Sequence, residues 1–302
     1  MCKIDLALGE MRILLSGDSG QLARDCREIL DAKHSLAGFS KEELDICDRQ
    51  AVESSLDHFK PDTLLNCAAF TKVDLSETQS NEAMRVNAEG PKILAEECQK
   101  RGIRLLHIST DYVFDGRKPI PEPYLESDTT NPLSSYGRSK LAGETAILST
   151  MDNFVILRTA WLYGIGGPNF LKTILKRALQ GAKLKIVHDQ YGSLTWTRTL
   201  AQQIEKILLS DARGIFHASA EGLCTWFDGA SYFLKKMGIP AEISPCTTAD
   251  YPTPAQRPRN SILENRALKG NDLNVMRPWQ KDIDDFVERY RDQLIRECRG
   301  ES

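Results

Sequence analysis

Two side chains with complementary chemistry, Tyr136 and Lys140, stand four residues apart within Ser135–Glu144. On a helix this spacing places them one turn apart on the same face. A lysine ammonium beside a phenol favours the phenolate and lowers the tyrosine pKa from about 10 towards neutrality. A tyrosine tuned in this way can pass a proton to or from a substrate oxygen. The same pair also occurs on ordinary solvated helix faces, so the spacing alone leaves a structural role open.

A third chemical group is expected at the end of an apolar run upstream. Leu105–Ile108 is followed by Ser109, Thr110 and Asp111. A buried parallel strand delivers side chains to the carboxyl edge of a sheet in this way. Thr110 is therefore expected to hold a substrate oxygen while Tyr136 moves the proton.

The expected first strand, Met11–Ser16, leads into a turn that could hold phosphate. The turn reads Gly17-Asp18-Ser19-Gly20-Gln21-Leu22-Ala23, and a helix is expected from there to about Leu30. Glycines let the backbone approach a pyrophosphate, and the start of the helix supplies N–H groups. The spacing lacks the close glycine pair of the long dinucleotide fingerprint, so a plain tight turn remains an alternative. We expect the charge of Asp18 to weaken cofactor binding.

The residue that would select the cofactor is a lysine. Lys41 stands about twenty residues beyond the glycine turn, where an acid would hold the ribose hydroxyls of NAD. A lysine there can meet a 2′-phosphate, which favours NADPH and leaves NADH possible. Asp45 and Ile46 follow as an expected wall beside the adenine, or as a loop with a helix cap.

Apolar strands alternating with helices predict an α/β fold with a doubly wound parallel sheet of the Rossmann type. Another buried strand is expected in Thr63–Ala69 and a long helix in Glu82–Arg101. Residues 1–160 are expected to form the NAD(P)-binding domain, with 1–10 as a flexible leader. Residues 161–302 mix short strands and helices and are expected to form a smaller α/β lid for substrate, with some segments returning to the sheet.

Composition narrows the classes of partner. The chain has 302 residues and a net charge of −3, without a basic block, which argues against nucleic acid. Eight scattered cysteines without a C-x-x-C pair indicate a reduced, cytoplasmic protein. No run approaches the roughly 20 apolar residues of a membrane span. His107, His188 and His217 lack metal-ligand spacing and are interpreted as ordinary hydrogen-bonded histidines, and no metal is expected.

Several motifs together resemble the extended short-chain dehydrogenase/reductases. They are Gly17-x-x-Gly20, Asn66-x-Ala68-Ala69, Ser109–Gly116 and Tyr136-x-x-x-Lys140. Four later blocks narrow the resemblance to the dTDP-4-dehydrorhamnose reductase family: Arg158–Gly164, Asp189–Ser193, Gly214–Ala218 and Arg257–Ser261. The resemblance runs from about Met11 to about Tyr290. Where the family commonly has Gly-Ser-Pro-Thr-Tyr-Thr, this chain has Gly192-Ser193-Leu194-Thr195-Trp196-Thr197.

The resemblance implies NAD(P)H-dependent reduction of the 4-keto group of dTDP-6-deoxy-L-lyxo-4-hexulose to dTDP-L-rhamnose. It implies a catalytic set of Thr110, Tyr136 and Lys140. The implied cofactor contacts, besides Tyr136, Lys140 and the Lys41 noted above, are Gly17, Gly20, Gln21, Leu22, Asp45, Ile46, Ala68, Ala69 and Thr71. The implied substrate contacts are Thr110, Tyr112, Trp161, Asn169 and Arg257, with Arg259 as a second phosphate ligand.

Plainer roles remain open for three of these residues. Trp161 can be a core tryptophan, Asn169 a helix cap, and Arg257 a surface arginine of a proline-rich loop. Two other functions also remain: a reductase of another nucleotide-linked 4-keto sugar, and a non-catalytic NADP-binding subunit that regulates a partner enzyme. A monomer or a homodimer is expected.

Overall fold

A six-stranded, fully parallel sheet forms the larger of two lobes. The computed structural model describes residues 10–300, so the expected leader, apart from Glu10, lies outside the described residues. The strands run in the order β2 (Ser35–Phe39), β1 (Arg12–Ser16), β3 (Thr63–Asn66), β4 (Arg104–Thr110), β5 (Phe154–Thr159) and β10 (Gly214–His217). Most apolar side chains of the central strands are fully buried, because helices cover both faces. The predicted doubly wound α/β sheet is confirmed.

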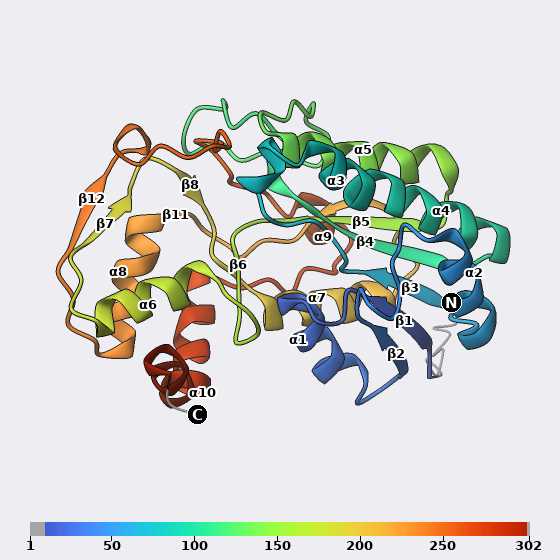
Figure 1. Cartoon of the computed structure of the whole chain (residues 1–302), viewed down its shortest axis with the longest axis horizontal. Coiled ribbons are helices and arrows are strands. Elements are labelled where there is room, and N and C mark those ends of the chain that lie inside the picture. Colours follow the sequence, from blue (N-terminus) through green and yellow to red (C-terminus); the bar gives the residue numbers. More distant parts are fainter. Residues whose placement is uncertain (1–9, 301–302) are drawn as a thin grey trace.

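Two layers of helices enclose the sheet (Figure 1). On one face α1 (Gln21–Leu30) packs against α7 (Thr197–Leu208), and their apolar side chains share a core with β1 and β5. On the other face lie α2 (Arg49–Phe59), α4 (Gly90–Arg101) and α5 (Ser135–Thr150). The short α9 (Arg266–Gly270) contacts the edge strand β10.

The long helix expected over Glu82–Arg101 is interrupted. It consists of α3 (Ser80–Met84), a π-helical turn over Arg85–Glu89 and then α4, which ends as predicted at Gly102 with φ 67°. A short 3₁₀ turn, Leu75–Glu77, precedes it. The π-helical turn contains Asn87, whose buried side chain contacts two other segments of the site. The periodicity of apolar residues does not report contacts of a polar side chain such as Asn87. The sequence therefore predicts a continuous helix here.

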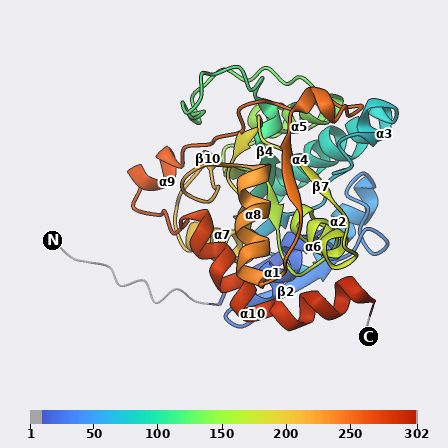
Figure 2. The same ribbon diagram turned by 90° about the vertical axis from the view of Figure 1, so that its left-hand side faces the viewer.

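The smaller lobe packs three helices around Phe233 and Phe286. These are α6 (Phe170–Leu179), α8 (Trp226–Met237) and α10 (Trp279–Arg299), and Figure 2 shows α8 upright in front with α10 below it. Three two-stranded pairs complete it: β7 (Leu184–Val187) with β12 (Ile243–Cys246), β6 (Leu162–Tyr163) with β9 (Thr195–Trp196), and β8 (Tyr191–Gly192) with β11 (Cys224–Thr225). Short 3₁₀ turns lie at Asp111–Val113 and Thr248–Asp250.

The chain crosses between the lobes more than once. Strands β6 to β9 belong to the smaller lobe. The next elements along the chain, α7 and β10, belong to the large sheet and its helix layer, and α8 lies in the smaller lobe again. Within residues 10–300, no helix is both long and apolar enough to cross a bilayer. In the same range, no three His, Cys, Asp or Glu side chains are grouped to hold a metal ion.

Candidate active site

A pocket of about 770 Å³ opens between the two lobes at the carboxyl ends of β1, β3 and β4. The chain runs from β1 outward to β2 and then returns to β3 on the other side of β1. Ligands of open α/β sheets bind at such a switch point. Every site residue predicted from the sequence except Asn169 and Arg259 lines this pocket. Those that do are Gly17, Gly20, Gln21, Leu22, Lys41, Asp45, Ile46, Ala68, Ala69, Thr71, Thr110, Tyr112, Tyr136, Lys140, Trp161 and Arg257. Their individual roles stay predictions.

The glycine turn after β1 has the shape that a pyrophosphate needs. Gly17 has φ 77°, and a Cβ there would lie 2.6 Å from the backbone nitrogen of Ala68 at the end of β3. A side chain is therefore excluded by both conformation and space. Gly20 is the N-cap of α1 and offers no side-chain cap, which leaves first-turn N–H groups open to an anion. The residues present thus fit the diphosphate of a dinucleotide.

Asp18 does not carry the uncompensated charge that we expected beside the phosphates. Its carboxylate forms an ion pair with Arg27 of α1. It is not among the described residues that line the pocket. The expected weakening of cofactor binding therefore lacks its physical cause, because the guanidinium compensates the negative charge.

The far end of the pocket combines a cation with an apolar wall. Lys41 is exposed there, which suits a solvent-facing phosphate. Asp45 forms an ion pair of 3.2 Å with Arg85. Ile46 is buried, and its side chain occupies the space that a Cβ on Gly90 would need. The Arg85 guanidinium is also paired with Glu82, so its charge is already compensated, and the role of Asp45 and Ile46 beside an adenine stays a prediction.

Helix α5 is fixed closely against its neighbours. Ser134 caps it by accepting a hydrogen bond from the Gly137 N–H at 3.1 Å. Gly143 lies against the backbone carbonyl of Asn87, so a larger residue would push the helix away. The Asn87 side chain bonds both the N–H and the carbonyl of Phe70 and donates to Ser139 Oγ. The π-helical turn thereby ties the pocket loop after β3 to the helix that carries Tyr136 and Lys140.

Tyr136 lies at the inner end of the pocket, with its ring edge-on to Tyr112 at a centroid distance of 5.5 Å. Enclosure by protein raises the pKa of the Tyr136 phenol well above its ordinary value, and the charge of Asp111 adds to the rise. The expectation that Lys140 draws this pKa towards neutrality is wrong for this structure. Burial determines the pKa of Tyr136, because the Lys140 ammonium contacts His107 and the Ile108 carbonyl instead of the phenol.

Lys140 is buried and points into the sheet. Its Nζ donates to the Ile108 carbonyl at 2.7 Å and lies 3.3 Å from Nε2 of His107. Burial lowers the pKa of Lys140 to about 8, although Glu144 and Cys67 oppose the shift. His107 was interpreted from the sequence as an ordinary histidine. Its contact with Lys140 depends on the alignment of β4 with α5, and no sequence signal marked it.

Asp111 is a second residue whose importance the sequence reasoning missed. Its side chain is 3% exposed, lines the pocket and accepts a hydrogen bond from Thr110 Oγ1 at 3.1 Å. Its Oδ2 atom has no hydrogen-bond partner in the described protein. Burial raises the pKa of Asp111 to about 6. Its place directly after Thr110 at a strand end was the signal that could have identified it.

An aromatic stack closes the side of the pocket formed by the smaller lobe. The indole of Trp161 stacks on that of Trp226 at 3.7 Å between centroids, and the tilted ring of Phe170 contacts Trp226 at 4.6 Å. Trp161 has φ 51°, an unusual conformation for a bulky residue. Gly192 leaves room for its ring, because a Cβ there would lie 2.7 Å from the indole. Trp161 thus lines the pocket while it packs against the core, and Trp226, which the sequence did not predict, lines the pocket beside it.

The polar residues expected at the substrate have different surroundings. Arg257 lines the pocket but is already paired, with Asp74 at 2.8 Å and with the Tyr112 hydroxyl at 2.9 Å. Asn169 is the N-cap of α6, and its amide donates to Gln21 Oε1 at 2.9 Å. The contacts of Asn169 are thus those of a helix cap, and the bond to Gln21 connects α6 to the phosphate turn.

Arg259 is exposed and is not among the described lining residues. The unusual segment Gly192–Thr197 is likewise outside the described lining. Leu194 and Trp196 are buried in the core of the smaller lobe. The residues that differ from the common pattern, Leu194 and Trp196, therefore affect the packing of the smaller lobe.

The arrangement as a whole can protonate an oxygen while a bound group reduces the carbon beside it. A phenol, a hydroxyl and an amine line the same pocket as a turn shaped for phosphate. A dinucleotide whose diphosphate lay on this turn could place its reactive ring beside Tyr136.

Comparisons with known proteins agree with this geometry. Residues 11–292 match the family model described as the RmlD substrate binding domain. A dTDP-4-dehydrorhamnose reductase of Streptomyces griseus is 39% identical, over 89% of this chain and 90% of the relative. A dTDP-4-keto-6-deoxy-D-glucose reductase of Streptomyces niveus is 38% identical, over 89% and 93%. The structure of dTDP-4-dehydrorhamnose reductase from Bacillus anthracis in complex with NADP superposes with a TM-score of 0.90 at 32% identity, covering 93% of this chain and 99% of that one. This chain therefore belongs to the dTDP-4-dehydrorhamnose reductase (RmlD) family.

Proposed function

We propose that the protein reduces the 4-keto group of dTDP-6-deoxy-L-lyxo-4-hexulose to give dTDP-L-rhamnose, with NADPH as the reductant. The observation that carries the proposal is the shared pocket, which is lined both by Thr110, Tyr136 and Lys140 and by the Gly17 turn. The family relationship over most of the chain supports the same substrate. The product is a building block for cell-surface polysaccharides.

The residues divide the chemistry among them. The bound nicotinamide supplies the hydride for the ketone carbon. The Tyr136 hydroxyl gives its proton to the emerging alkoxide oxygen, and its raised pKa keeps the phenol protonated at neutral pH, which is the form a reduction needs. The Thr110 hydroxyl would orient the carbonyl, and Lys140, which also lines the pocket, would hold a ribose hydroxyl of the bound cofactor.

NADPH is proposed over NADH because the exposed Lys41 lines the pocket where an acid would hold the ribose hydroxyls of NAD. A lysine ammonium suits a 2′-phosphate. The related Bacillus anthracis structure contains NADP, which supports the choice. NADH remains usable if the lysine contact contributes little.

The first experiment measures NADPH oxidation by the purified protein with the dTDP-4-keto sugar, and NADH alongside. We expect Tyr136→Phe to lower kcat by about 10²–10⁴-fold, since general acid catalysis contributes that much. The matched control is Tyr112→Phe, which removes the neighbouring phenol that accepts from Arg257. It should change KM more than kcat. Equal kcat in Tyr136→Phe and the unaltered protein would refute the assigned acid.

A reductase of another nucleotide-linked 4-keto sugar is the second candidate. It is favoured by the near-equal identity to the Streptomyces niveus enzyme. A panel of dTDP- and UDP-linked 4-keto sugars, compared by kcat/KM, separates the two. Tight NADPH binding without turnover on any of them would instead favour a regulatory subunit.

The expected cytoplasmic location and the monomeric or homodimeric state stay predictions. The seven cysteines in the described part of the chain are all free, which suits a reducing compartment. Light scattering coupled to size-exclusion chromatography measures the oligomeric state.

A further inference from the structure

A chain of buried polar groups runs from β1 through the sheet to Lys140. Ser16 Oγ donates to Asn66 Oδ1 at 2.8 Å, and Asn66 Nδ2 lies 2.9 Å from Nδ1 of His107. His107 Nε2 then lies 3.3 Å from Lys140 Nζ. Ser16, Asn66 and His107 are 0% exposed and Lys140 is 2% exposed. Water cannot easily relieve a mismatch in such a chain.

The direction of the hydrogen bonds is set at Asn66. Its Oδ1 atom accepts from the backbone N–H of Ala68 at 3.1 Å as well as from Ser16. A backbone N–H can only donate, so this contact fixes which end of the amide is oxygen. The Nδ2 group must then face His107 as a donor.

This donor determines the tautomer of His107. Nδ1 has to accept the hydrogen bond from Asn66, so it carries no proton. A second proton on the ring is opposed, because burial and the neighbouring Lys140 hold the pKa of His107 well below its ordinary value. The single ring proton is therefore on Nε2, which is the nitrogen that faces Lys140.

An N–H group aimed at an ammonium is a contact between two donors. It becomes a hydrogen bond when Lys140 is a neutral amine, which accepts from His107 and still donates to the Ile108 carbonyl. We propose that Asn66 and His107 act as positioning residues that make Lys140 a proton-exchanging amine near neutral pH rather than a permanent cation. Lowering of the Lys140 pKa to about 8 by burial points the same way.

None of the other titratable groups around Lys140 that are named here favours its neutral form. Glu144, one turn further along α5, is paired with Arg158 at 2.6 Å and also accepts from Ser109. Cys67 follows β3, and Tyr136 precedes Lys140 on α5. Glu144 and Cys67 favour the ammonium, so the opposing influences are burial and the His107 N–H group.

The test follows both protons by NMR in the full chain, without turnover. Long-range ¹H–¹⁵N correlation on ¹⁵N-histidine protein reports the tautomer of each of the five histidines, with His107 assigned from His107→Phe. We expect the Nε2–H form at neutral pH. Titration of ¹³Cε-lysine protein, with Lys140 assigned from Lys140→Arg, reports the charge of Lys140. An Nδ1–H signal for His107 in the unaltered protein would overturn the proposal without any variant having to fold.

Asn66→Asp is the decisive variant, because a carboxylate of the same shape accepts where the amide donated. It should move the His107 proton to Nδ1 and raise the Lys140 midpoint by about one pH unit or more. Its charge alone would also raise the midpoint, so the change is repeated in His107→Phe, where most of the shift should vanish. Equal shifts in both backgrounds would mean that charge acts directly, and the proposal fails.

Ser16→Ala is the matched control, since it removes a partner of Asn66 without altering the amide direction. It should leave both the tautomer and the Lys140 midpoint unchanged. The pH profile of kcat/KM should shift with the midpoint in Asn66→Asp. That kinetic arm rests on the reductase activity proposed above, whereas the NMR arms hold for a protein with any substrate.

Discussion

The Asp111 carboxyl shows how a single side chain at the pocket can cost stability. Burial raises its pKa to about 6 from an ordinary value of 3.8. Because the folded protein holds the proton more tightly than the unfolded chain, this group favours folding below pH 4, and the contribution is lost as the pH rises through 6. Above that range the folded protein carries a poorly solvated carboxylate beside Thr110.

Asp111→Asn should therefore gain stability relative to the unaltered protein as the pH rises. We expect the difference in free energy of unfolding to grow by about 1–3 kcal/mol between pH 4 and pH 7. Urea unfolding at several pH values measures it. A difference that is constant with pH would show that Asp111 titrates normally. Lower kcat in the more stable variant would indicate that the carboxylate is retained for its place beside Tyr136.

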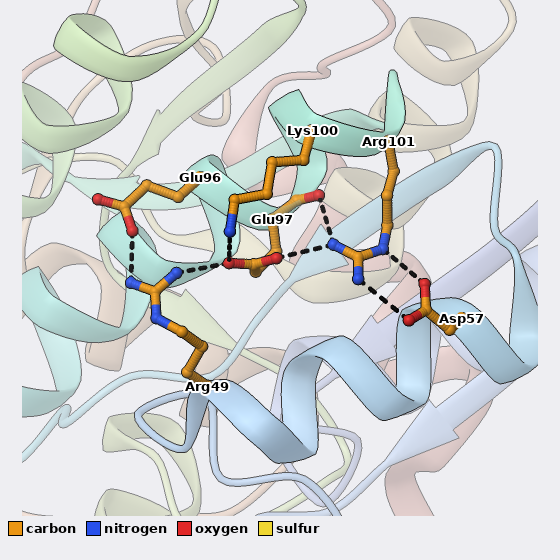
Figure 3. A network of polar contacts seen from close by, with 6 residues as sticks. All are labelled: Arg49, Asp57, Glu96, Glu97, Lys100 and Arg101. Carbon is orange, nitrogen blue, oxygen red and sulfur yellow. Dashed lines mark hydrogen bonds and ion pairs between the residues drawn. The ribbon is translucent and has the colours of Figure 1, made fainter.

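At the scale of the elements, α2 and α4 are joined by an ionic network around one buried acid (Figure 3). Glu97 of α4 is fully covered and contacts Arg49 of α2, Lys100 and Arg101. Arg101 also reaches back to Asp57 of α2 at 2.7 Å. Burial alone would raise the Glu97 pKa, but these hydrogen bonds bring it to about 2.

Glu97→Gln should lower the free energy of unfolding by about 2–3 kcal/mol at pH 7, since it removes the covered carboxylate that Arg49, Lys100 and Arg101 share. A depressed pKa stabilises the fold fully above pH 4.5 and less as the pH falls towards 2. The penalty should thus shrink in acid. Glu96→Gln, which removes a half-exposed contact to Arg49, is the control and should cost under about 1 kcal/mol. Equal losses in the two variants would contradict a special role for Glu97.

The elements themselves were predictable where local signals agree. Continuous apolar runs indicated β1, β4 and β5, and the stops at Gly102 and Gly238 hold because both adopt positive φ. The π-helical turn at Asn87 was not predictable, because its cause is a contact with Phe70 and Ser139 from other segments.

For the molecule as a whole, types of residue were predictable but their pairings were not. The pattern of Tyr136, Lys140 and Thr110 identified one end of the pocket, since each stands at a helix face or strand end. The stack of Trp161 on Trp226 and the approach of His107 to Lys140 arise when distant segments meet. The direction of the Tyr136 pKa was wrong for the same reason: it depends on enclosure by the complete fold.

The late return of α7 and β10 to the large sheet has a consequence for how the protein is made. Leu200, Ile204, Ile207 and Phe216 complete the core on the α1 face of the sheet. During synthesis residues 1–160 emerge from the ribosome before these side chains do. The nascent sheet must therefore wait with an uncovered apolar face, which invites chaperones and aggregation.

A chain ending at residue 160 should accordingly be insoluble or bind the dye ANS strongly, while the full chain should do neither. Co-expression with residues 161–302 as a separate chain is the control, and we expect it to restore solubility in part. A monomeric, cooperatively unfolding 1–160 fragment would show that the first half is self-sufficient. If the fragment does not fold alone, residues 1–160 are not a unit that recombination can transfer to another protein. The segments that complete the sheet, α7 and β10, come later in the chain.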